Sequence, residues 1–229
     1  MSTMYINGVD IAEFGATLLS DYSIGAIEPE VDYQRGRGRT SIEVLALDAG
    51  LRGIDFYLEF SGKDRHELML RKSKVDSLLM GKSELYMPDG FYYTCVPVYI
   101  GEMISEGAAG KYLVSKAIYR VQGICHDELQ TLELDGYTIN CRSTRPKTDC
   151  CLQVTAPEAA STFVLGPVTF TNVSAGETLV ADGINGRIIQ GDVYATDMQM
   201  LTLPYLVPGE NTIPCTAGDL TVSYYPSYL

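Results

Sequence analysis

Tryptophan is absent from this chain of 229 residues, and histidine occurs only twice, at His66 and His126. Catalysis by a Ser-His-Asp or Cys-His arrangement would have to use one of these two imidazoles. His66 falls among the charged residues of an expected helix, where an exposed position explains it. His126 belongs to the run Cys-His-Asp at 125–127, but consecutive side chains of a strand point to opposite faces. Neither histidine therefore predicts an active site.

Paired cysteine motifs are also missing. The six cysteines include no C-x-x-C pair and have no histidine at metal-ligand spacing, so no zinc site is expected; they stand at positions 95, 125, 141, 150, 151 and 215. The start of the chain resembles no export signal. We therefore expect reduced thiols that pack as small apolar groups, including the adjacent Cys150 and Cys151.

The common nucleotide-binding and hydrolase motifs do not occur. The chain has no P-loop, no G-x-G-x-x-G that opens a helix after a strand, and no G-x-S-x-G elbow. The run DGING at 182–186 begins like a calcium loop. It lacks the further oxygen ligands and the closing glutamate, so it predicts a turn instead. We expect no enzyme activity, no cofactor and no bound metal.

Long apolar runs and positive charge are both scarce. No run approaches the roughly 20 apolar residues of a membrane helix, and we expect synthesis in the cytoplasm. The formal net charge is −12, with 13 basic against 19 acidic residues in 1–130 and 4 against 10 in 131–229. Neither half is therefore suited to binding nucleic acid by neutralising its phosphates.

Alternation of apolar and polar residues dominates what is present. In the stretch 54–62 the apolar side chains of Ile54, Phe56, Leu58 and Phe60 fall on one face, as in a half-buried strand. Similar stretches, separated by turn residues, occupy 41–47, 90–101, 111–122, 167–173, 177–183, 186–195 and 219–225. Pro97 cannot donate a ladder hydrogen bond, so its strand is expected to be an edge strand or bulged.

One segment has helical spacing instead. We predict a helix over about residues 64–80, because Leu68, Val75 and Leu79 fall on one face, Asp64 and Glu67 form a start resembling a capping box, and a glycine follows. A single helix in a β-rich chain most simply covers an open sheet face. A polar stretch beginning at His126 divides the chain into two predicted domains, 1–130 and 131–229.

The only compact basic run is QRGRGRTS at 34–41. Its arginines alternate with glycines, as Arg35, Gly36, Arg37, Gly38 and Arg39. The run could contact nucleic acid, form a solvated loop, or contact another protein. The acidic surroundings favour the last two, and a guanidinium can bind acidic groups of a neighbouring subunit. We take these five residues as a candidate subunit interface.

A second conspicuous run is LPYLVPGENTIP at 203–214. Pro208 pre-sets the first turn dihedral, Gly209 tolerates positive φ, and Asn211 accepts turn geometry. The run therefore predicts a hairpin turn between two strands that closes the second domain.

The order of these features resembles the distal tail protein family, Dit, of long-tailed siphophages. In the first half the resemblance lies in YINGVDI, RGRGRTSIEVLAL, IDFYLEFSG, VDSLLMG and SELYMPDGFYYTCVPVYIGE. In the second half it lies in GPVTFTNVSAGETLVADG, LTVSYYPSYL and a Pro-x-Leu-x-Pro-Gly-x-Asn turn, formed here by Pro204, Leu206, Pro208, Gly209 and Asn211. It covers nearly the whole chain.

The resemblance implies a mainly β fold. An N-terminal β-sandwich or barrel-like domain would carry one helix and an extended belt hairpin, followed by a C-terminal galectin-like β-sandwich. It also implies a structural virion protein at the distal end of the tail. A homo-hexameric ring, or a stacked pair of rings, would join the tail tube protein to the tail-associated tip protein and to receptor-binding or fibre proteins, and DNA would pass through it without specific binding.

The alternative function is a carbohydrate-binding module that contacts host surface glycans. The chain has 16 tyrosines that could stack on sugar rings. The absence of tryptophan, the strongest stacking side chain, opposes this alternative. No inserted carbohydrate-binding module interrupts its short loops.

Overall fold

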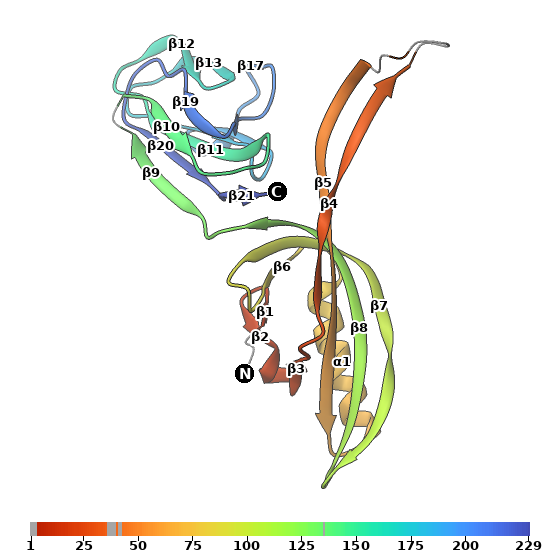
Figure 1. Ribbon diagram of the computed structural model, residues 1–229. Coiled ribbons are helices and arrows are strands. Elements are labelled where there is room, and N and C mark those ends of the chain that lie inside the picture. The colour runs from red at the N-terminus through yellow and green to blue at the C-terminus, as the bar shows by residue number, and fades with distance from the viewer. Residues whose placement is uncertain (1–3, 36–39, 41–42, 135) are drawn as a thin grey trace. The chain divides into compact units, whose positions relative to one another are not determined.

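The computed structural model describes residues 4–35, 40, 43–134 and 136–229. The fold is mainly β with a single α-helix among these residues, which confirms the predicted fold class (Figure 1). The chain forms two compact units, Met1–His126 together with Leu229, and Asp127–Tyr228. This division falls a few residues before the predicted boundary between 130 and 131. The ring-forming and galectin-like characters assigned to the two domains stay predictions.

The first unit is built on one curled antiparallel sheet with the strand order β2-β1-β6-β7-β8-β5-β3, and β4 pairs with β5 beyond this path. Its strands are β1 (Tyr5–Ile6), β2 (Val9–Asp10), β3 (Ala16–Leu18), β4 (Ser23–Gln34), β5 (Glu43–Gly62), β6 (Ser83–Tyr86), β7 (Tyr92–Ala109) and β8 (Tyr112–His126). A short 3-10 helix, η1 (Ile11–Phe14), links β2 to β3. Gly123 permits β8 to approach β7 closely, because a Cβ there would lie 2.7 Å from the Cβ of Cys95.

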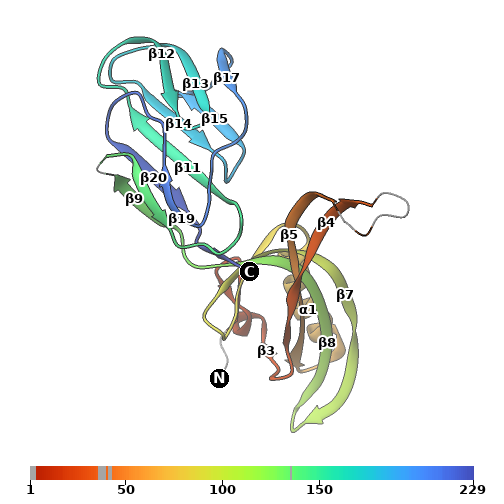
Figure 2. The same ribbon diagram turned by 45° about the horizontal axis from the view of Figure 1, so that its top comes forward.

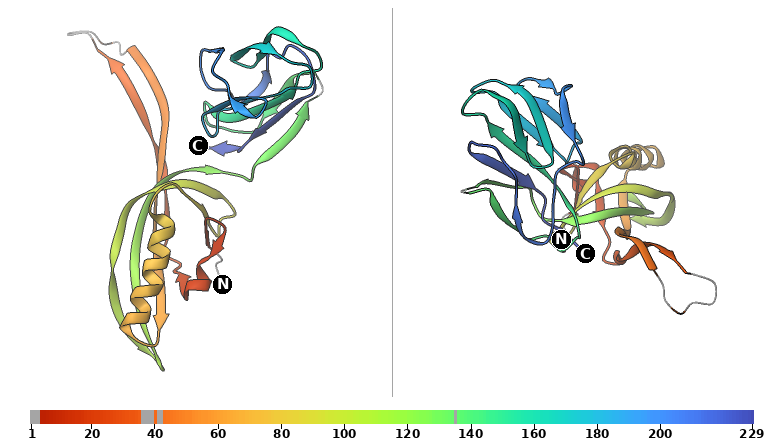
Figure 3. Two further views of the ribbon diagram at one scale, coloured as in Figure 1. Left: turned by 180° about the vertical axis from the view of Figure 1, so that it is seen from behind. Right: turned by 90° about the horizontal axis from the view of Figure 1, so that it is seen from above.

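Helix α1 (Arg65–Leu79) lies against the concave face of this sheet, as Figure 3 shows from behind. Its start and end agree with the predicted helix. The predicted apolar face is buried, and Lys72 joins it with only 6% of its surface exposed. The Lys72 ammonium group is 2.7 Å from an Asp76 oxygen, and the other Asp76 oxygen accepts a hydrogen bond of 2.8 Å from the Tyr119 hydroxyl.

Strand β5 differs from its prediction in length. The sequence predicts two strands, at 41–47 and 54–62, whereas β5 runs unbroken over 20 residues. The glycines and the arginine between the two stretches do not interrupt it. Pro97 lies beyond the part of β7 that pairs with β6 and next to a register shift against β8. The prediction of an edge or bulged position is therefore confirmed.

The second unit contains three antiparallel sheets: two that pack face to face, as Figure 2 shows, and a two-stranded sheet formed by β10 and β19. Of the two packed sheets, the larger has the order β16-β15-β14-β11-β20-β9 and the smaller β12-β13-β17. The strands are β9 (Gln130–Leu134), β10 (Thr138–Cys141), β11 (Thr148–Thr155), β12 (Ala160–Leu165), β13 (Val168–Val173), β14 (Thr178–Asp182), β15 (Arg187–Gln190), β16 (Val193–Tyr194), β17 (Met198–Met200), β18 (Tyr205–Leu206), β19 (Gly209–Thr212), β20 (Leu220–Tyr224) and β21 (Ser227–Tyr228). One apolar core fills the space between the sheets and draws large side chains from both, among them Leu152, Phe163, Phe170 and Val222.

The prediction of a hairpin at 203–214 is wrong. The two strands that flank the turn do not pair with each other: β18 pairs with β11, and β19 pairs with β10. The side chain of Asn211 stabilises the corner, because its amide oxygen accepts a hydrogen bond from the Val207 N–H at 2.8 Å and its amide nitrogen donates to the Val207 carbonyl at 2.8 Å. The predicted turn residues do form a turn, with a φ of 88° at Gly209, but the strands on its two sides pair with different partners.

Candidate subunit interface

Strands β4 and β5 continue past the sheet as a two-stranded ribbon, which we call the arm. The arm consists of residues 27–34 of β4, the following residue Arg35, and residues 43–49 of β5. Strand β5 pairs with β8 from Arg52 onward, whereas the arm residues of β5 pair with β4 alone. Figure 1 shows the arm extending away from the sheet and from α1. An isolated two-stranded ribbon is marginally stable in water. Within the arm, the paired backbone of each strand depends on the other arm strand alone.

Apolar side chains of the arm face solvent. The exposed fractions are 44% for Val31, 60% for Tyr33, 56% for Val44 and 55% for Leu45. Tyr33 and Val44 are register partners, so their side chains share one face of the ribbon. An exposed apolar surface of this kind typically marks a protein interface. The alternation of acidic and apolar residues in EVDY at 30–33 is the sequence signal that could have located this apolar surface.

The arm is acidic among its described residues. Glu30, Asp32, Glu43 and Asp48 are all exposed. Arg35 is exposed directly after the end of β4. The other members of the candidate interface, Gly36, Arg37, Gly38 and Arg39, lie outside the described residues. Their role in subunit contact stays a prediction.

The two histidines lie in different environments of the first unit. His66 is exposed in the first turn of α1. Nε2 of His126 lies 2.9 Å from the Thr94 hydroxyl, and the imidazole stacks on the Tyr92 ring at 6.0 Å between centroids. Among the described residues, no group of three or more His, Cys, Asp or Glu side chains could hold a metal ion. No helix in the described part of the chain is long and apolar enough to cross a membrane.

The six cysteines are free thiols, four of them buried. Burial raises the pKa of Cys95 and of Cys150 to about 12, and that of Cys151 to about 11. A thiol with a pKa in this range is almost entirely protonated at neutral pH and therefore a poor nucleophile. Cys150 and Cys151 are consecutive in β11, so their side chains leave the strand on opposite faces.

An apolar pocket of the second unit lies beside the corner at 203–214. It has a volume of about 320 Å³, and Tyr205 contributes to its wall. The Lys147 ammonium group lies 4.9 Å from the centroid of the Tyr205 ring. A sugar that stacked on this face of Tyr205 would have to displace Lys147. Tyr194 lies on the short strand β16 and is 67% exposed.

Comparison with known proteins gives structural matches alone. No protein-family profile and no curated protein sequence matches this chain. Its fold matches the Dit protein of phage SPP1, described as a paradigm of the hub adsorption apparatus in phages that infect Gram-positive bacteria. The TM-score is 0.68 and the identity 11%, and the match covers 100% of both chains.

A second match is a chain from the phage P2 baseplate in its activated conformation with calcium. Its TM-score is 0.52 and its identity 8%, and it covers 97% of this chain and 98% of that one. At these identities the matches establish a shared fold. The resemblance to the Dit family that the sequence suggests is thus confirmed at the level of the fold.

Proposed function

We propose that this protein is a structural component of a phage tail, a distal hub of the Dit type. One observation carries the proposal: the fold matches the SPP1 Dit protein, a hub of the adsorption apparatus, over the full length of both chains. The match spans both compact units as well as the arm. A shared module in one unit would not account for it.

The proposed assembly is a homo-hexameric ring, single or stacked, in which the arm of each subunit packs on its neighbour. The exposed apolar side chains of the arm support this role, since a partner surface would remove them from water. The ring would join the tail tube protein to the tail-associated tip protein and carry receptor-binding or fibre proteins. This function is structural rather than enzymatic, and it places the protein in the virion.

The negative net charge of the chain opposes the assembly of such a ring. Each subunit adds a formal charge of −12, so apolar burial and the few concentrated cations must overcome mutual repulsion between copies. The same acidity suits a channel for DNA, because a lining without basic patches does not hold phosphates. The genome could then pass without specific binding.

Native mass spectrometry of the purified full-length chain tests the proposal. A ring has a mass of six, or of twice six, times the 25.1 kDa of one chain. A double change of Tyr33→Ser and Val44→Ser should shift the distribution toward monomer. Tyr194→Ser is a matched control, because it removes an equally exposed tyrosine from the second unit. A strictly monomeric wild-type protein at micromolar concentration would refute the ring.

A glycan array with the full-length chain tests the alternative function. We expect no specific binding. Binding that is lost on Tyr194→Ser or Tyr205→Ser would instead identify a carbohydrate-binding surface in the second unit.

A further inference from the structure

Four aromatic residues form a row across four strands of the sheet in the first unit, and Figure 1 labels these strands β1, β6, β7 and β8. Tyr5 in β1 is the register partner of Tyr86 in β6, which is in turn the partner of Tyr92 in β7. Tyr92 is the partner of His126 in β8. Directly opposed residues of antiparallel strands project from the same face. The row therefore crosses four strands on one face of the sheet.

The three tyrosine rings of the row are tilted against one another rather than coplanar. The centroids of Tyr5 and Tyr86 are 6.0 Å apart with an angle of 54° between the ring planes. Those of Tyr86 and Tyr92 are 4.8 Å apart at 49°. Two ring faces inclined in this way form a wedge. A flat sugar ring stacks best on a single open face, whereas a wedge lets two faces approach one compact group.

A pocket of about 270 Å³ opens at this wedge and is lined by Tyr5, Gly8, Glu84, Tyr86 and Tyr92. Gly8 belongs to a two-residue turn with φ values of 52° at Asn7 and 77° at Gly8. The positive φ favours glycine there, and the missing side chain leaves the mouth of the pocket open.

Glu84 places a carboxylate in the wall of this pocket. Its backbone is held by Asn7, whose side-chain oxygen accepts a hydrogen bond of 2.8 Å from the Glu84 N–H and whose own N–H donates to the Glu84 carbonyl at 2.7 Å. Among the described residues, no group hydrogen-bonds or ion-pairs with the Glu84 carboxylate. The pocket thus combines aromatic faces with one negative charge that its own chain leaves uncompensated.

A cation is the ligand that this combination attracts, because the faces of aromatic rings are electron-rich. Elsewhere the chain fills such faces itself: Lys72 lies 5.6 Å from the ring of Tyr119, and Arg120 lies 6.0 Å from that of Tyr99. Within the described part of the chain, no cation lies over Tyr5 or Tyr86.

We propose that the pocket formed by Tyr5, Glu84 and Tyr86 binds an arginine or lysine side chain of a protein partner. The guanidinium or ammonium group occupies the pocket beside the faces of Tyr5 and Tyr86 and forms an ion pair with Glu84. An acidic protein with a net charge of −12 attracts basic partner segments over a distance, and the pocket fixes one cationic side chain at the contact. This inference stands on the pocket itself and does not depend on the hexameric ring.

Titration of the full-length protein with N-acetyl-arginine N-methylamide tests it, followed by NMR of ring-labelled tyrosines. The lysine analogue and N-acetylglucosamine are titrated in parallel. We expect the tyrosine signals to move with a dissociation constant on the order of 1 mM for one or both cations, as for a single cation–π and ion-pair contact. Added salt should weaken the binding, since it screens the ion pair.

Variants assign the site. Glu84→Gln keeps the shape of the side chain and should reduce the affinity about tenfold, whereas Tyr86→Phe keeps the ring and should leave the affinity nearly unchanged. Glu59→Gln, on β5 and outside the pocket, is the matched control. Three outcomes would overturn the proposal: no shift with either cation, binding of the sugar alone, or equal effects of Glu84→Gln and Glu59→Gln.

Discussion

The two halves of strand β5 have the same backbone but opposite surroundings. In the half that pairs with β8, Ile54, Phe56, Leu58 and Phe60 are completely buried under α1. In the half that belongs to the arm, Val44 and Leu45 are more than half exposed. Both halves are rich in apolar residues. Alternation along a strand therefore indicates an apolar face, but it does not show whether the chain itself covers that face.

The largest effect is expected in the covered half. Phe56→Ala removes a ring that stacks on Tyr119 at 5.3 Å between centroids, and it should lower the free energy of unfolding by about 4 kcal/mol through lost burial and a residual cavity. Urea unfolding of the full-length chain measures this loss. Tyr33→Ala in the arm is the control, with an expected change within about 0.5 kcal/mol in the unassembled chain. Equal losses for both variants would contradict the comparison.

The arm should respond in assembly rather than in folding. Tyr33→Ser together with Val44→Ser removes the exposed apolar pair, so we expect subunit association to weaken about tenfold to a hundredfold. Analytical ultracentrifugation over a concentration series measures the association constant. Urea unfolding of the monomer should stay as in the wild type. If the variant associates as tightly as the wild type, the arm is not the interface.

A smaller loss of association is expected from the candidate basic residues. Changing Arg35, Arg37 and Arg39 to Ser should weaken assembly a few-fold, because exposed ion pairs contribute roughly 0 to 1 kcal/mol each. The difference from the wild type should shrink as salt is added, since salt screens these pairs. Sedimentation at low and high salt checks both statements. A difference that grows with salt would exclude ion pairing as the cause.

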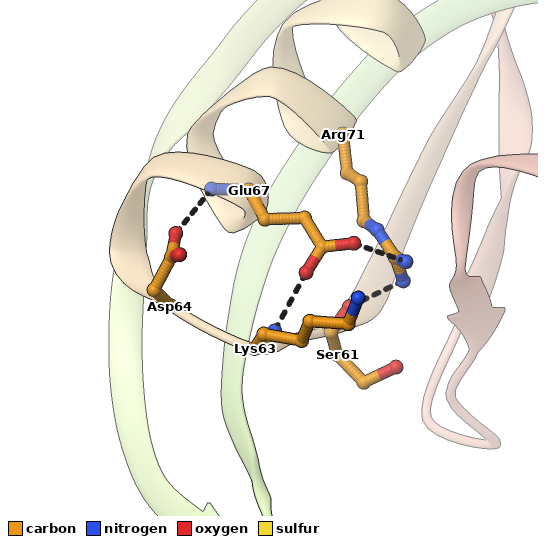
Figure 4. A network of polar contacts seen from close by, with 5 residues as sticks. All are labelled: Ser61, Lys63, Asp64, Glu67 and Arg71. Carbon is orange, nitrogen blue, oxygen red and sulfur yellow. Dashed lines mark hydrogen bonds and ion pairs between the residues drawn. The ribbon is translucent and has the colours of Figure 1, made fainter.

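The N-terminal cap of α1 offers a free-energy change of similar size, but in folding rather than in association. An Asp64 carboxylate oxygen accepts a hydrogen bond of 2.8 Å from the Glu67 N–H, as Figure 4 shows. Asp64→Ala leaves that donor without its cap and should reduce stability by about 1 kcal/mol. Asp64→Asn retains the acceptor and serves as the control in the same urea titration. Association should be unchanged in both variants, in contrast to the arm variants.

The smallest effect concerns pH. The hydrogen bond from the Lys63 N–H, followed by the Arg71 guanidinium, holds the pKa of Glu67 below its usual range. A lowered folded-state pKa means that this carboxylate adds stability above its unfolded pKa and loses it as the pH falls through the folded value. Glu67→Gln should therefore unfold slightly more easily at neutral pH and equal the wild type in strong acid. A difference that persists at low pH would assign the effect to packing.

Much of the first unit could be predicted from local patterns. The spacing of Leu68, Val75 and Leu79 and the cap at Asp64 located the helix, and the alternation from Ile54 to Phe60 located the buried strand. Lys72 could not be assigned to the buried face: its i,i+4 partner Asp76 is local, but the Tyr119 ring that Lys72 lies over comes from a distant strand. The prediction of a hairpin at Pro208 was wrong for a related reason. Turn residues specify a local reversal of the chain, but they do not specify which strands pair on either side of it.

Less of the functional surface could be predicted. The concentrated charge of the arginine run predicts a contact surface, but residues 36–39 lie outside the described structure. Tyr33 and Val44 are separated in sequence and share a face only through the register of the arm. The same holds for Tyr5, Tyr86 and Tyr92, which pairing between strands brings into one row. Cross-strand neighbours of this kind need a register, and a single sequence does not supply it.

The unbroken course of β5 has a mechanical consequence. Backbone hydrogen bonds lie across the strand direction, and β5 is bonded to β8 along the whole stretch from Arg52 to Gly62. A force that pulls the arm along the strand therefore loads all of these hydrogen bonds together in shear, and they do not break one after another. Tension that reaches the arm is carried into the sheet as a shared load, and the base of the arm resists extension as a single tether.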